Sequence, residues 1–131
     1  MNYILYVFIP LILIGCNQQN RELNTKIIND NLCLFTNESK DYGKDNFLVH
    51  FAKIDFSKEY RSEYEKSYSK TDLPISEKNC IAIPLDKLEK NLAYTITLST
   101  INKSFNSRIC VLEDGSTISI KQVEAGKSTC E

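Results

Sequence analysis

Five cysteines are the side chains best able to do covalent chemistry in this 131-residue chain. They stand at positions 16, 33, 80, 110 and 130, and no two of them form a CxxC pair. Zinc sites usually bring cysteines and histidines together at short, paired spacings. The chain has a single histidine, His50, which is far in sequence from any pair of cysteines. The pattern therefore favours disulfides over a metal site, and we expect no metal and no cofactor.

His50 is also the only histidine that could act as a general base, and it lies inside the apolar run FLVHFAKIDF. A catalytic histidine needs an acid or a nucleophile beside it, and the chain has no GxSxG or other nucleophile motif. The carboxylate pairs Glu63 with Glu65 and Glu113 with Asp114 belong to charged runs typical of solvated surface. We expect position 50 to be a half-buried strand residue, and we expect the protein not to be an enzyme.

The segment 57–72, SKEYRSEYEKSYSKTD, interleaves tyrosines with charges of both signs. Its three tyrosines stand at intervals of four residues and would share one face of a helix or of a strand. Because Tyr and Arg are enriched at binding hot spots, the candidate partner-binding residues are Tyr60, Arg61, Tyr64 and Tyr68. The other interpretation is that the tyrosines cover the edge of the fold while the charges discourage edge pairing.

The N-terminus has the pattern of a processing signal. Tyr3 to Gly15 are thirteen uncharged, mainly apolar residues, too few for a membrane helix of about 20 residues but suited to a signal peptide. The run ends in Leu13–Cys16, which resembles the lipobox of bacterial lipoproteins. The resemblance implies removal of residues 1–15 and lipidation of Cys16. With Asn at position 17, it also implies an outer-membrane location facing the periplasm. Residues 16–30 would then be the lipidated Cys and a polar tether.

An exported domain of this size commonly depends on disulfides. If Cys16 carries lipid, four cysteines remain and allow three pairings. We favour Cys33–Cys80 with Cys110–Cys130, whose loops would contribute roughly 4 and roughly 3 kcal/mol on the chain-entropy estimate. The other pairings remain open at the level of sequence.

The rest of the chain predicts one all-β domain over residues 31–131. The clearest strand is Leu92 to Ile101, where apolar and polar residues alternate. Residues 108–123 predict a hairpin with Asp114-Gly115 at its turn. Further strands are expected at Asn31–Thr36, Phe47–Phe56, Tyr60–Tyr68 and Cys80–Leu85, with a weak one at Thr25–Ile28. About seven short strands favour a β-sandwich, and a net charge of -1 gives no basic surface for nucleic acid.

Residues 85–97, LDKLEKNLAYTIT, carry a more specific pattern. A Leu, a short polar loop and a Tyr that opens an alternating strand resemble the E–F corner of fibronectin type III and immunoglobulin-like domains. The resemblance implies that Leu88 and Tyr94 form a pair and that the Tyr94 hydroxyl bonds back to the preceding loop. It also places Cys33 and Cys80 on neighbouring strands. The antibody-type disulfide is absent, because Ile96 stands where its cysteine would be.

Three blocks together resemble a family of small enterobacterial-type lipoproteins regarded as type VI secretion immunity proteins of the periplasm. They are the lipobox, NLCLF at 31–35 and PISEKNCIAIPLDKLEKNLAYTITLST at 74–100. The resemblance implies a lipid-anchored protein that binds and neutralises a delivered protein toxin, and it transfers no catalytic or cofactor residues. A lysozyme inhibitor of the envelope and a structural envelope lipoprotein without a toxin partner are the alternatives.

Overall fold

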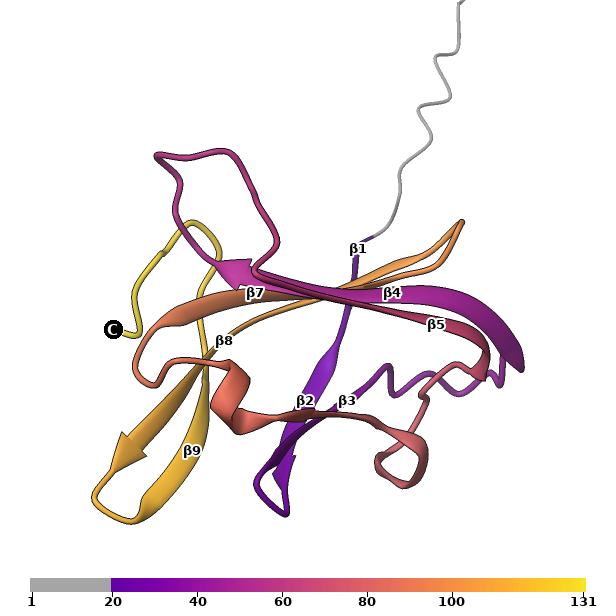
Figure 1. Ribbon diagram of the computed structural model, residues 1–131, viewed down its shortest axis with the longest axis horizontal. Helices are drawn as coiled ribbons and strands as arrows, with labels where there is room; N and C mark the ends of the chain where they lie inside the picture. The colour runs from indigo at the N-terminus through magenta and orange to yellow at the C-terminus, as the bar shows by residue number, and fades with distance from the viewer. Residues whose placement is uncertain (1–19) are drawn as a thin grey trace, which may run out of the picture.

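The computed structural model describes residues 20–131, which form two β-sheets packed face to face (Figure 1). The expected signal peptide at 1–15 and the lipidation site at Cys16 lie outside these residues. One sheet has six strands in the order β1-β8-β7-β4-β5, with β9 also paired to β8, and the other has the order β2-β3-β6. The described part contains no α-helix. The expected all-β, sandwich-like architecture is therefore confirmed.

The bounds of the elements follow the chain in order. The strands are β1 (Asn20–Glu22), β2 (Asn24–Ile28), β3 (Asn31–Phe35), β4 (Lys44–Lys53), β5 (Tyr64–Asp72), β6 (Ile81–Pro84), β7 (Ala93–Ser99), β8 (Ser104–Asp114) and β9 (Thr117–Gln122). Two short 3-10 helices flank β6, namely η1 (Glu77–Asn79) and η2 (Leu85–Lys87).

The core lies between the two sheets and is filled by alternate residues of the central strands. The residues that β4, β7, β3 and β6 bury there are Phe47, Val49, Phe51, Tyr94, Ile96, Leu98, Leu32, Leu34, Ile81 and Ile83. Each such burial contributes about 1.5–3 kcal/mol relative to an exposed side chain. The alternation predicted from Leu92 begins only at Tyr94, because Leu92 is 39% exposed and Asn91 turns the chain with φ +62° just before β7.

The folded domain begins earlier than the expected boundary at residue 31. Strands β1 and β2 lie within residues 20–28, where the sequence predicts a polar tether with a weak strand at Thr25–Ile28. The three residues of β1, NRE, carry no apolar alternation that would predict a strand. They are held instead by parallel pairing with β8 and by Leu23, which is 1% exposed. Residues 20–28 therefore belong to the folded domain and not to the polar tether predicted for residues 16–30.

Two expected strands are shifted along the chain. Strand β4 ends at Lys53 rather than at Phe56, and β5 begins at Tyr64 rather than at Tyr60. The Asp55 carboxylate accepts a hydrogen bond from the Ser57 N–H at 3.0 Å, a local turn that competes with the extended conformation. The residues between β4 and β5 therefore form a loop, 54–63, instead of continuing the sheet.

The two hairpin turns of two residues use residues that tolerate positive φ. Asn29 and Asp30, with φ of 50° and 60°, join β2 to β3. Gly115, with φ of 60°, is the first residue of the two-residue turn between β8 and β9, as favoured in such hairpins. The expected hairpin at 108–123 is confirmed, with its turn one residue later than Asp114-Gly115.

Both favoured disulfides are present. Cys33 and Cys80 have Cα atoms 5.4 Å apart, and Cys110 and Cys130 have Cα atoms 5.8 Å apart. Cys33 lies on β3, opposite Ala82 of β6, so the first bond joins neighbouring strands as expected. The second fastens the C-terminal segment to β8.

The expected tyrosine contact is also confirmed. The Glu89 N–H donates to the Tyr94 hydroxyl at 3.0 Å, and Leu88 beside it is 2% exposed. Burial raises the pKa of Tyr94 above its usual value. This bond ties the loop that leaves β6 to the central strand β7.

The ends of β4 mark the two ends of the sandwich. The 54–63 loop follows its last residue and lies at the left in Figure 1. The β3–β4 loop (36–43) precedes its first residue, and the β7–β8 turn (100–103) lies at the same end, because Leu48 pairs with Ser99. Strand β1 also begins there, because Asn20 pairs with Ser104.

Candidate protein-binding surface

The structure divides the four candidate residues into two pairs. Tyr64 and Tyr68 lie on β5 and stack on core side chains, the first on Phe51 and the second on Phe47, with ring centroids 4.8 Å apart in both cases. Both tyrosines are half-buried and pack against the core. Their rings therefore cover the edge of the sandwich, which is the alternative interpretation given above.

The charges between them also suit an edge strand. Strand β5 ends the order of its sheet, and Lys66 pairs with the buried Val49 of β4, on the same face as the two tyrosines. Its Nζ lies 5.1 Å from the centre of the Tyr68 ring. A charge on the inward face of an edge strand opposes pairing with another chain.

Tyr60 and Arg61 belong to the 54–63 loop. Two backbone bonds fix the ends of this loop: Ile54 N–H donates to the Ala93 carbonyl at 2.9 Å, and Glu63 N–H donates to the Phe51 carbonyl at 2.9 Å. Between these points the chain leaves the sheet, so Tyr60 does not share a face with the tyrosines of β5. The loop projects from the end of the domain in Figure 1.

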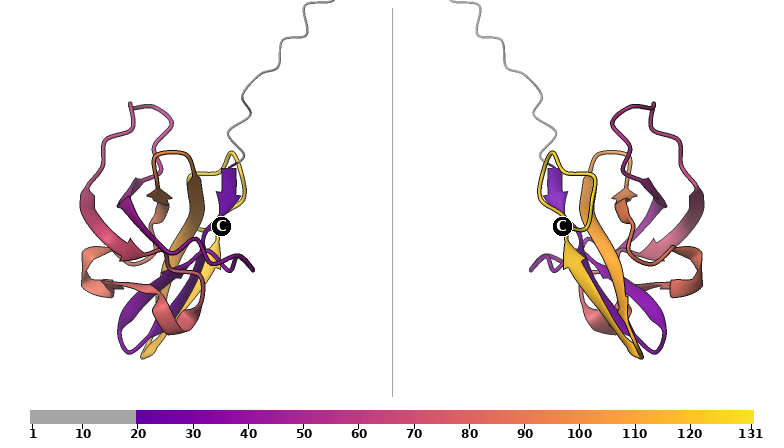
Figure 2. Two further views of the ribbon diagram at one scale, coloured as in Figure 1. Left: turned by 90° about the vertical axis from the view of Figure 1, so that its right-hand side faces the viewer. Right: turned by 90° about the vertical axis from the view of Figure 1, so that its left-hand side faces the viewer.

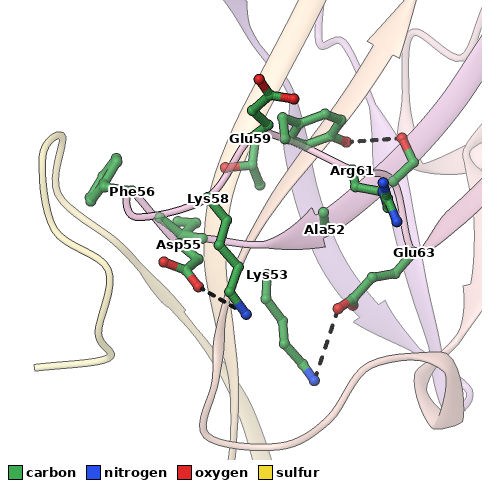
Figure 3. Close-up of a pocket in the computed structure, with 12 residues that line it drawn as sticks. Ala52, Lys53, Asp55, Phe56, Lys58, Glu59, Arg61 and Glu63 are labelled. Carbon is green, nitrogen blue, oxygen red and sulfur yellow. Dashed lines mark hydrogen bonds and ion pairs between the residues drawn. The ribbon is translucent and has the colours of Figure 1, made fainter.

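The loop and the sheet enclose an open hollow of about 660 Å³ (Figure 3). Ala52 and Thr95, from the outward side of β4 and β7, line it together with residues of the loop. Two ion pairs cross its rim, Lys58 with Asp55 at 4.0 Å and Lys53 with Glu63 at 4.0 Å. The hollow therefore has a small-residue floor and a wall of mixed charge.

Three side chains of the loop are available to a partner. Phe56 is 69% exposed and Tyr60 is 54% exposed, and Figure 3 shows Phe56 at the tip, turned away from the charged wall. Arg61 is exposed and has no carboxylate within 4.0 Å among residues 20–131. Exposed aromatic rings beside an arginine are typical of binding hot spots.

The sequence indicated Tyr60 and Arg61 but not Phe56, which the expected strand would have placed in a sheet. The signal that could have found it is Asp55-Phe56-Ser57, since an Asp two residues before a Ser favours a local turn. A turn there leaves an aromatic ring at its tip without a sheet to cover it.

His50 holds the loop against the outward face of the sheet. Its Nδ1 lies 2.6 Å from the Tyr60 hydroxyl oxygen, and the rings meet edge to face with centroids 5.6 Å apart. His50 is half-buried, as expected, and is flanked in register by Glu65 of β5 and Thr97 of β7. Burial lowers the pKa of His50, and the charge of Glu65 partly opposes that shift.

This lowered pKa predicts a loss of stability in acid. In the unfolded chain His50 takes up a proton near pH 6.5, whereas in the folded protein it does so only at lower pH. The unfolding free energy is therefore at its full value above pH 6.5 and decreases as the pH falls below it. We expect the wild-type protein to lose unfolding free energy relative to His50→Gln between about pH 7.5 and about pH 5. Urea unfolding of both proteins at several pH values measures this difference in unfolding free energy. A difference that stays constant over this pH range would contradict the prediction.

The described part of the chain has neither a cluster of metal-ligating side chains nor a helix that could span a membrane. Within residues 20–131, no group of three or more His, Cys, Asp or Glu is placed to hold a metal ion. Over the same residues, no helix is long and apolar enough to cross a membrane.

The geometry is that of a projecting loop above an open hollow, on which Phe56, Tyr60 and Arg61 are exposed. No protein-family model matches the chain, and no curated protein or solved structure is similar enough to count as a match.

Proposed function

We propose that this protein is a lipid-anchored envelope lipoprotein, facing the periplasm, that binds and neutralises a protein toxin delivered by type VI secretion. The observation that carries the proposal is the 54–63 loop, which presents Phe56, Tyr60 and Arg61 above a hollow. Such a loop suits a protein partner, because interface cores favour aromatic side chains and arginine. The two disulfides support the proposed export, since such bonds persist in oxidising compartments.

The domain type proposed is immunoglobulin-like or fibronectin type III-like. Two features support it: the order β2-β3-β6 in one sheet facing β5-β4-β7-β8 in the other, and the bond from the loop backbone to Tyr94. In such sandwiches the loops gather at the two ends and commonly carry binding sites. The 54–63 loop occupies such a position.

The proposal is tested by protection and by capture together. Cells that lack the protein should be killed by sister cells that carry the secretion system and should be rescued by restoring it. The lipidated protein taken from the envelope should capture a secreted toxin of those sister cells. If deletion leaves cells no more sensitive and no toxin is recovered, the immunity proposal is wrong.

The loop should be the main determinant of toxin binding. We expect Phe56→Ala and Arg61→Ala each to weaken binding by about 30-fold or more, the effect typical of a hot-spot residue. Lys121→Ala is the control, because this exposed lysine lies on β9, outside the hollow. Titration calorimetry of the captured pair measures the change, and equal affinities for all three variants would place the interface elsewhere.

A lysozyme inhibitor is the second candidate, and one observation favours it. Tyr60 and Ser62 lie on an exposed loop beside Glu59 and Glu63, and acidic groups next to a protruding hydroxyl suit a basic enzyme cleft. The purified protein would then inhibit lysozyme in a cell-wall lysis assay, and Glu59→Gln would weaken that inhibition. A structural lipoprotein would show neither protection nor inhibition.

A further inference from the structure

Three cationic side chains from separate segments converge on one tyrosine at the end of the sandwich opposite the 54–63 loop. Arg21 of β1 donates from Nη1 to the Tyr42 hydroxyl at 2.9 Å. The Nζ atoms of Lys40 and Lys103 lie 5.4 and 4.6 Å from the centre of the same ring. One carboxylate, Glu38, lies 3.0 Å from Arg21. Asp41 lies on the same loop as Lys40 and Tyr42, so the cluster has three cations against two carboxylates and keeps a net positive charge.

An exposed apolar side chain stands beside this cluster. Ile101, at the tip of the β7–β8 turn, is 96% exposed. The turn is held by its own bonds: the Thr100 hydroxyl accepts the N–H of Asn102 at 3.3 Å and of Lys103 at 3.0 Å. The isoleucine is thus presented outward on an ordered turn, where it contributes nothing to the core of its own domain.

The chain that would carry the proposed lipid joins the domain at this same end of the sandwich. Asn20 begins β1 and pairs with Ser104, immediately after the β7–β8 turn; Figure 2, left, looks onto this end of the sandwich. Only residues 17–19 separate Asn20 from Cys16. A fully extended chain spans roughly 3.3–3.6 Å per residue, so the four residue steps from Cys16 to Asn20 can reach at most about 14 Å. A lipid on Cys16 would therefore hold this end, and not the 54–63 loop, close to the bilayer.

We propose that Arg21, Lys40, Tyr42, Ile101 and Lys103, here called the anchor-end patch, dock the domain on the surface of an anionic bilayer. The inference rests on the proposed lipidation of Cys16. The cations bind lipid phosphates, the tyrosine lies at headgroup level, and the isoleucine enters the acyl boundary. The lipid sets only the distance to the membrane, whereas the patch sets the orientation and leaves the 54–63 loop facing away from the bilayer.

The chain offers a direct probe because it contains no tryptophan. In Ile101→Trp the single indole would report the environment of the turn, and in Phe56→Trp it would report the opposite end. The lipidated protein is placed in vesicles of phosphatidylcholine and phosphatidylglycerol whose acyl chains carry bromine. We expect blue-shifted emission and strong quenching for Ile101→Trp, and neither for Phe56→Trp.

Charge reversal tests the cations separately from the anchor. Adding Lys40→Glu and Lys103→Glu to Ile101→Trp should lower the ratio of docked to undocked protein by about ten-fold or more, since each lysine near an anionic surface favours binding by about five-fold. Lys87→Glu with Lys121→Glu makes the same charge change at exposed positions away from the patch and should leave the quenching unchanged. Vesicles of phosphatidylcholine alone should reduce the quenching of Ile101→Trp.

The outcomes separate this inference from the function proposed above. Protein that floats with the vesicles and carries the acyl mass, yet shows no quenching at position 101, would overturn docking and leave the anchor and the toxin proposal intact. Protein without acyl mass that does not float would overturn both the anchor and the docking. Equal quenching at positions 101 and 56 would show tumbling on the lipid and would also contradict the proposed orientation.

Discussion

Replacing Cys33 and Cys80 together by alanine is expected to remove about 4 kcal/mol of unfolding free energy, the value for a loop closed over 47 residues. Alanine is used because Cys33 is 1% exposed and a serine hydroxyl would be buried there. A domain of this size has a total stability of only about 5–15 kcal/mol. The double variant should therefore unfold at a much lower urea concentration.

The second disulfide provides the comparison. Replacing Cys110 and Cys130 by alanine opens a loop of 20 residues and should cost about 3 kcal/mol, somewhat less than the first pair. Equilibrium urea unfolding of the three proteins measures both losses. If the Cys33 and Cys80 variant matched the wild-type protein in stability, the bond between β3 and the start of β6 would not form in solution.

The largest effect of a single substitution is expected at Phe51. This ring is 1% exposed, stacks on Tyr64 at 4.8 Å and meets Tyr94 edge to face at 5.7 Å between ring centroids. Phe51→Ala should cost about 3–5 kcal/mol, because it removes buried apolar area and leaves a cavity. It would also remove the surface on which the edge strand β5 rests.

Phe56→Ala is the matched control, since it deletes the same ring from a 69% exposed position. It should change stability by no more than about 0.5 kcal/mol, and thermal unfolding compares the two variants. A similar loss in both would mean that the 54–63 loop packs against the domain. A stable Phe56→Ala protein also ensures that any loss of toxin binding in this variant comes from the missing ring.

Local patterns were sufficient to predict most of the sandwich. Alternation identified β7, and a Gly after an Asp identified the hairpin of β8 and β9, because both signals depend on neighbouring residues alone. The resemblance to the E–F corner of fibronectin type III domains implied that Cys33 and Cys80 lie on neighbouring strands, and their disulfide is present. The same resemblance implied the bond between Tyr94 and its loop, whose partner, Glu89, is five residues away.

What the sequence could not show depends on residues brought together from a distance. Strand β1 exists because three polar residues pair with β8, more than eighty positions later in the chain. The sequence NRE alone therefore does not predict a strand. The cluster around Tyr42 draws on β1, the β3–β4 loop and the β7–β8 turn, so it appears only when the register of those elements is known. The four-residue spacing of the tyrosines was misleading for the surface, because Tyr60 lies in the 54–63 loop whereas Tyr64 and Tyr68 lie on β5.

The parallel pairing of β1 with β8 has a mechanical consequence. A partner held at the 54–63 loop and a lipid held at the N-terminus would pull on opposite ends of the domain, roughly along its strands. Tension of this kind would shear the contacts of β1 along β8, including the bond from the Leu23 N–H to the Asn106 carbonyl at 2.8 Å. Bonds loaded in shear share the force and break together, whereas a peeled strand loses them one at a time. The short first strand would then act as a clamp that keeps the tethered domain folded under load.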